Sequence, residues 1–121
     1  MVTRPATTEY VAEKQRRFHA SVVEQVQAAT VEHEVVVVGM QFNPHVARLR
    51  KALGAAGVAH HYLEFGGYLS MWRQRLAIKL WSGWPTFPQV FVAGTLVGGA
   101  DQVEHMLADG SLTGLLEAPG A

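Results

Sequence analysis

The sequence contains no cysteine, and this absence limits the chemistry of the chain more than any other feature of its composition. Without cysteine the chain has no disulfide, no thiolate ligand for zinc or an iron–sulfur cluster, and no thiol nucleophile. An excess of charge is also lacking, because ten basic residues balance ten acidic ones. We therefore expect no nucleic-acid partner, since proteins that bind nucleic acids concentrate positive charge.

Long apolar runs are absent as well. No stretch approaches the roughly 18 consecutive apolar residues that a membrane-spanning helix requires. The short polar start at residues 1–5 does not resemble a secretory leader, so we expect no membrane attachment and a cytoplasmic location. Hydrophobic residues nevertheless make up 49% of the 121 residues, which is enough for the core of one domain.

Apolar spacing and turn residues predict eight elements in the order α-β-α-β-α-β-β-α. The expected helices cover residues 8–29, 44–56, 69–81 and about 101–109, and the expected strands cover 35–38, 59–65, 89–92 and 95–97. Alternating strands and helices indicate a parallel βαβ half, and Ala93-Gly94 joins the last two strands as a hairpin. The unbroken valine run at 35–38 is typical of a strand that is covered on both faces.

Several residues define the expected helices more closely. Thr7 or Thr8 would cap the first helix, while Asn43 and Pro44 suit the N-cap and first position of the second. In the helix at 69–81 we expect three apolar side chains, at Trp72, Leu76 and Leu80, to turn inward.

Two short motifs carry more specific information than this pattern. The segment Trp84-Pro85-Thr86-Phe87-Pro88-Gln89-Val90-Phe91 resembles the W-P-T-x-P-Q-[VL]-[FY] motif of glutaredoxins, and Gly98-Gly99-Ala100-Asp101 resembles their G-G-x-D. The spacing Arg75-x-x-x-Lys79-x-x-Ser82-x-Trp84 is similar to that of the monothiol type. The resemblance covers residues 33–116 and implies an α/β thioredoxin-like fold, with a four-stranded mixed sheet flanked by helices. Residues 1–32 would then be a helical extension packed on the domain, and residues 117–121 a tail.

The resemblance also implies a glutathione site. Pro88 would follow a cis peptide bond, and the backbone of Phe87 would bind the cysteine moiety of glutathione. The backbone at Gly99 and Ala100 would take the γ-glutamyl carboxylate, and Asp101 would help to hold the ammonium. Arg75 and Lys79 would face the glycine carboxylate. Each feature has a plainer alternative: a trans proline in a turn, an aspartate that only caps a helix, and a solvated basic face.

The chain departs from the family at the position of its chemistry. Dithiol glutaredoxins read K-x-x-C-P-[YF]-C, whereas this chain has Met40 for the lysine, Asn43 for the nucleophile and Val46 for the resolving cysteine. Asparagine cannot form a mixed disulfide, so we expect no thiol–disulfide exchange and no iron–sulfur cluster. His45 is the one titratable group in this loop, and it could contact a ligand, act as an acid or base, or be solvated.

Three functions fit these residues. The first is a non-catalytic module that binds glutathione or a related thiol or peptide through residues 40, 43, 45, 75, 79, 87, 88 and 99–101. The second is a protein-interaction domain without a small ligand, for which Tyr68 and Trp72 would supply contacts. The third is an enzyme with new chemistry, which no constellation of nucleophile, base and orienting group supports. The sequence leaves open whether the chain is a monomer or a homodimer.

Overall fold

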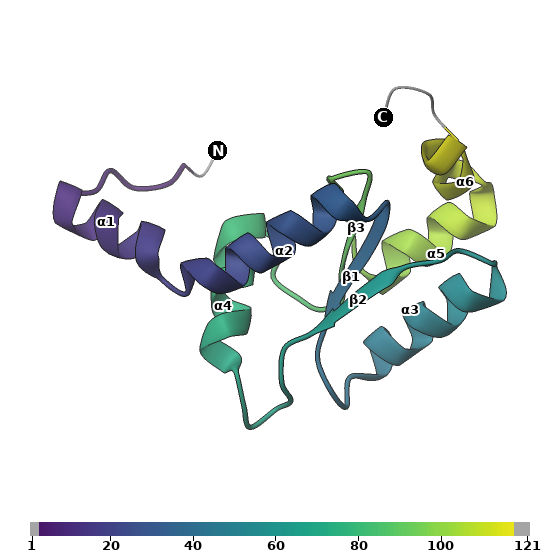
Figure 1. The fold of residues 1–121 in the computed structure, drawn as a ribbon, viewed down its shortest axis with the longest axis horizontal. Coiled ribbons are helices and arrows are strands. Elements are labelled where there is room, and N and C mark those ends of the chain that lie inside the picture. Colours follow the sequence, from purple (N-terminus) through teal and green to yellow (C-terminus); the bar gives the residue numbers. More distant parts are fainter. Residues whose placement is uncertain (1–2, 118–121) are drawn as a thin grey trace.

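A four-stranded mixed sheet forms the centre of the protein, with helices on both faces (Figure 1). The computed structural model describes residues 3–117. The strands are β1 (Val35–Gly39), β2 (His61–Glu64), β3 (Gln89–Val92) and β4 (Thr95–Gly98), in the spatial order β2-β1-β3-β4. Strand β1 pairs in parallel with β2 and antiparallel with β3, which pairs antiparallel with β4. The predicted mixed sheet is confirmed.

The valines of β1 divide the core into two parts. Val35 to Val38 are at most 2% exposed, and successive side chains point to opposite faces of the sheet. Val35 and Val37 belong to a cluster that includes residues of α3 (Pro44–Ala55), α5 (Ala100–Asp109) and α6 (Ser111–Glu117). Val36 and Val38 belong to a second cluster with α2 (Ala20–Glu32) and α4 (Trp72–Ser82). The strand is therefore covered on both faces, as its composition predicts.

The N-terminal segment departs from the prediction. The segment forms two helices, α1 (Glu9–Arg17) and α2. The prediction of a single helix at 8–29 is therefore wrong. The chain breaks at Phe18 and His19, and His19 adopts the left-handed conformation with φ of 45°. Thr8 caps α1, since its Oγ1 accepts a hydrogen bond from the Val11 amide at 3.3 Å. Helix α2 packs into the core through Val26 and Ala29, whereas α1 buries no residue and projects away from the sheet (Figure 1).

The inward face of α4 also differs from the prediction. The helix starts at Trp72 rather than at 69, and Trp72, Leu76 and Leu80 are 57%, 37% and 64% exposed, so their inward placement is wrong. The buried residues are instead Arg75, Ala77 and Ile78. Because apolar residues occur on two faces of this helix, their spacing alone could not identify the face that packs on the sheet.

The remaining elements follow the sequence more closely. Ala93 and Gly94 form the hairpin turn with φ of 50° and 79°, both left-handed. Residues 111–116, for which no helix was expected, lie within α6, which Leu112 anchors at 1% exposure. Most of the predicted tail, residues 118–121, lies outside the described residues, and the division into extension, domain and tail stays a prediction. No helix within residues 3–117 is long and apolar enough to cross a membrane.

Candidate functional site

Asn43 occupies the position that the family pattern assigns to the nucleophile, and it caps α3. Its side-chain Oδ1 accepts hydrogen bonds from the amides of His45 at 2.9 Å and Val46 at 3.2 Å. Pro44 takes the first helical position, where its missing N–H leaves no bond unmade. The amide oxygen thus receives the N–H groups that would stabilise a thiolate at a helix N-terminus.

The other two altered positions are packed into the protein. Met40 and Val46 are 8% and 4% exposed, so neither presents a charged or reactive group to solvent. Val46 and Tyr62 lie so close to Gly39 that a Cβ atom there would come within 2.9 Å of both side chains. This close packing accounts for glycine at the end of β1 and for an apolar residue at position 46.

Arg48 connects the start of α3 to the start of α5. Its Nη1 lies 3.3 Å from His45 Nδ1, its Nη2 donates to Asp101 Oδ1 at 2.7 Å, and its Nε donates to Glu104 Oε1 at 2.6 Å. Glu104, through its hydrogen bond, and to a smaller extent Asp101 hold the pKa of Arg48 above its ordinary value. Arg48 follows His45 by three residues, and this spacing was the signal in the sequence that both share one side of α3.

Pro88 and Gly99 bring the two family motifs into contact. The Phe87–Pro88 peptide is cis, as the resemblance implies. A Cβ atom on Gly99 would lie 3.2 Å from the Pro88 carbonyl oxygen, so a larger residue would push the two segments apart. Gly99 is the N-cap of α5, and its amide donates to Gln102 Oε1 at 2.9 Å. Asp101 is therefore not the cap, which corrects the plainer alternative for this residue.

Lys79 and Arg75 share a helix but have different surroundings. Lys79 Nζ lies 5.6 Å from the centroid of the Phe87 ring. Arg75 is 8% exposed, and its Nη1 donates to the carbonyl oxygens of Phe65 at 2.8 Å and Ser70 at 2.7 Å. One guanidinium nitrogen of Arg75 is thus engaged by the loop before α4, whereas Lys79 points its charge over the segment that precedes β3.

Gln89 has a role that the sequence did not reveal. This fully buried side chain donates from Nε2 to the Trp84 carbonyl oxygen at 2.9 Å, which closes the proline-containing loop on itself. Gln89 Oε1 and Trp84 Nε1 are buried without a hydrogen-bond partner among the described residues. The motif therefore pairs tryptophan and glutamine for a structural reason, because the glutamine holds the loop that presents Phe87 and Pro88.

His60, just before β2, and His61, at its start, do not converge on a metal. Arg50 Nε contacts His60 Nε2 at 3.3 Å, while the ring of His61 stacks on that of His33 at 4.0 Å. Within residues 3–117 no group of three or more metal-ligating side chains could hold an ion. An iron–sulfur cluster does not fit this donor set either, since the chain supplies no thiolate.

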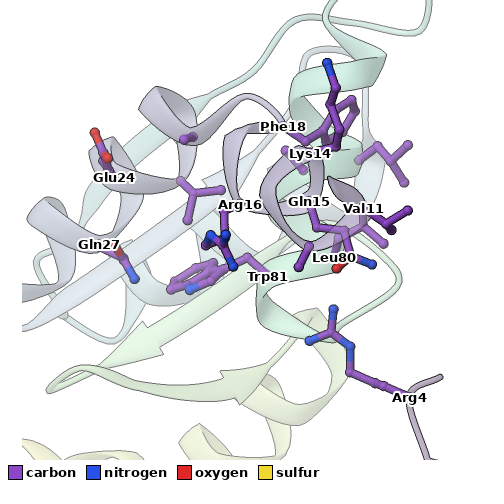
Figure 2. A pocket seen from close by; sticks show the side chains of 15 residues that line it. Arg4, Val11, Lys14, Gln15, Arg16, Phe18, Glu24, Gln27, Leu80 and Trp81 are labelled. Carbon is purple, nitrogen blue, oxygen red and sulfur yellow. The ribbon is translucent and has the colours of Figure 1, made fainter. Parts of the chain in front are cut away.

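A groove of about 800 Å³ lies between α1, α2 and α4 (Figure 2). Its lining includes the apolar side chains of Phe18, Leu80 and Trp81 and the cations of Arg4 and Lys14. None of the predicted site residues lines it. Because α1 stands off from α4, Leu80 faces this groove rather than the core.

The similarity to known proteins agrees with these motifs. A "Glutaredoxin-like protein" of Dictyostelium discoideum is 48% identical over 105 residues, which are 87% of this chain and 85% of that protein. The chain belongs to the glutaredoxin family. A "Probable monothiol glutaredoxin GrlA" of Legionella pneumophila is 36% identical over 58% of this chain and 75% of its own length. No family model matches the chain, so the similarity is to individual glutaredoxins.

Solved glutaredoxins share the fold. The crystal structure of a buckwheat glutaredoxin–glutathione complex has a TM-score of 0.72 at 23% identity, covering 91% of this chain and 94% of that one. Reduced glutaredoxin C1 from Populus tremula x tremuloides, solved in solution, has a TM-score of 0.74 at 21% identity and covers 85% of this chain and 88% of that one. The protein is thus a glutaredoxin by descent and fold that carries none of the cysteines of thiol chemistry.

Proposed function

We propose that this glutaredoxin-like protein binds glutathione, or a related thiol or peptide, without reacting with it. The observation that carries the proposal is the contact between the Pro88 carbonyl and Gly99. This contact joins six residues into one row, which we call the ligand row: Lys79, Phe87, Pro88, Gly99, Ala100 and Asp101.

The charges along the ligand row match those of glutathione. Lys79 provides a cation beside Phe87, suited to the glycine carboxylate at one end of the tripeptide. At the other end, Ala100 and Asp101 start a ten-residue helix, where backbone N–H groups have no helical acceptor and favour an anion. The Asp101 side chain is 86% exposed and uses Oδ1 for Arg48, so Oδ2 can accept the γ-glutamyl ammonium.

Asn43 would leave the sulfur of the ligand unchanged. Its amide carries no ionisable proton and is already bonded to two backbone amides, so it neither attacks a disulfide nor activates a thiol. Binding therefore requires the peptide part of the ligand and not its thiol. The roles of Met40, His45 and Arg75 in ligand contact remain predictions.

The test is the melting temperature in the presence of glutathione, glutathione disulfide and S-methylglutathione. A ligand at ten times its Kd stabilises the folded state by about 1.4 kcal/mol, which raises Tm by several degrees in a domain of this size. Because no thiol exchange is involved, S-methylglutathione should raise Tm as much as glutathione does. No shift with any of the three ligands at millimolar concentration would contradict the proposal.

Matched variants locate the site. Lys79→Gln and Asp101→Asn each remove one charge of the ligand row and should reduce the shift. Lys51→Gln removes an exposed lysine of α3 that lies outside the ligand row and should leave it unchanged. Equal shifts in all three variants would place the ligand elsewhere on the protein.

A further inference from the structure

Two loops at the carboxyl ends of β1 and β2 lie side by side, at the lower edge of Figure 1. The Gln41 amide donates to the Gly66 carbonyl at 2.7 Å, and Tyr68 Oη donates to the Phe42 carbonyl at 3.1 Å. Together the loops and the start of α4 expose five large apolar side chains, which we call the loop patch: Phe42 (81% exposed), Tyr68 (63%), Leu69 (100%), Met71 (38%) and Trp72 (57%).

The protein holds the loop patch in a defined conformation. Buried Arg75 donates to the carbonyls at both ends of the second loop, at Phe65 and Ser70, and Ser70 Oγ accepts from the Gly67 amide at 3.0 Å. Phe42 and Met71 have φ of 59° and 56°, a region that bulky side chains rarely occupy. A group of exposed apolar side chains on loops of fixed conformation is typical of an interaction site.

Basic residues outnumber acidic ones in the part of the sequence that carries the loop patch. Between residues 35 and 100 the only acidic residue is Glu64, which accepts a hydrogen bond from Tyr62. The same segment contains six basic residues: Arg48, Arg50, Lys51, Arg73, Arg75 and Lys79. The guanidinium of Arg73 lies 5.1 Å from the ring centroid of Trp72 in the patch, and Arg73 has no ion-pair partner within residues 3–117.

We propose that the loop patch docks an acidic segment of a partner protein. Apolar side chains of that segment pack on Phe42, Leu69 and Trp72, and its carboxylates face Arg73. A second copy of the chain fits less well, because two patches face to face would bring the Arg73 side chains together. A peptide is favoured over a membrane because Phe42 directly precedes Asn43 at the predicted ligand site, and this part of the argument rests on the proposed function.

Backbone amide NMR shifts of the whole protein provide the test. The probe is a synthetic peptide of three Glu-Leu-Asp-Phe repeats, and the controls replace its acids by lysine or its apolar residues by serine. We expect the probe to shift the amides at 42 and 67–73, and each control to bind at least about tenfold more weakly. Absence of shifts in the patch, or equal binding of the lysine peptide, would overturn the proposal.

Variants and two competing occupants complete the experiment. Leu69→Ser with Trp72→Ser, and separately Arg73→Glu, should each weaken the probe at least about tenfold, whereas Val31→Ser, at an 87% exposed position of α2, should not. Preferential binding of phosphatidylglycerol vesicles, or self-association through the patch, would also overturn it. The shift of Tm with glutathione separates the two proposals. The patch variants should keep this shift while they lose peptide binding, which supports both proposals. If the unaltered protein binds the peptide but shows no shift of Tm with glutathione, only the proposed function is refuted.

Discussion

Position 43 shows how one side chain can exchange reactivity for stability. A cysteine there would present a thiolate to the first amides of α3, whereas Asn43 accepts hydrogen bonds from two of them. Asparagine is among the best N-cap residues, and replacing a cap by alanine costs about 0.5–2 kcal/mol. The residue that removes the family's chemistry therefore also strengthens the start of the helix.

This cap gives a prediction for unfolding experiments. Asn43→Ala should lower the free energy of unfolding by about 1 kcal/mol, because the amides of His45 and Val46 lose their acceptor. Asn43→Ser keeps an acceptor at the N-cap and should cost less. Urea titrations followed by circular dichroism measure both values. Equal loss in the two variants would show that the cap contributes little.

Residue-scale contacts also mark the limit of what the sequence could predict. The capping roles of Thr8 and Asn43 depend on neighbours within three residues, so the local pattern predicts them. Arg48 reaches Asp101 across 53 positions, and only the packing of α3 beside α5 brings the two together. A contact of this kind requires the fold, and so it escaped sequence reasoning.

At the scale of elements, the helices of this protein differ in how much they depend on tertiary packing. Helix α2 contributes Val26 and Ala29 to the core, but α1 buries nothing and is held by Thr8 and by exposed ion pairs such as Arg17 with Glu13 at 2.7 Å. Exposed pairs contribute little to stability. The break between the helices was not predicted because His19 is not a glycine and carries no sequence signal for a left-handed φ.

A pair of proline substitutions tests this difference. Ala28→Pro lies at an exposed position inside α2 and should cost about 3 kcal/mol, since it removes a hydrogen bond from a packed helix. Ala12→Pro breaks the same kind of bond, to the Thr8 carbonyl, in α1 and should leave global unfolding almost unchanged. Thermal unfolding of both variants gives the comparison, and a large loss in Ala12→Pro would show that α1 packs more firmly than its burial indicates.

Across the whole molecule, a net charge of zero conceals an uneven distribution. The acidic residues lie mainly before β1 and from Asp101 onward, whereas the middle of the chain is basic. Composition alone therefore predicts an electrically neutral surface, and only the order of residues and the fold place Arg73 beside Trp72 of the loop patch. Fold class was predictable because its signals are repeated along the chain; surface placement was not, because it depends on which helix face packs inward.

Stability should depend on pH through His60. Burial, with a smaller effect of nearby Arg50, lowers the pKa of His60, so the folded state binds this proton less readily than the unfolded chain does. The stabilising effect is present above the unfolded pKa near 6.5 and is lost as pH falls below it. Tm measured from pH 7.5 to 5 should therefore fall less steeply in His60→Gln than in the unaltered protein. His105→Gln, at an exposed position, should not reduce the slope.

Asn43, the N-cap of α3, also determines how this position responds to oxidants. A thiol in this place could be converted to a sulfenic acid, a mixed disulfide or a metal thiolate, and each form would present a different surface to a ligand. Asn43 has one covalent form under oxidising and reducing conditions alike, and the neighbouring sulfur of Met40 is buried. Oxidative stress would change which forms of glutathione surround the protein while leaving the ligand row, which contains no sulfur, the same.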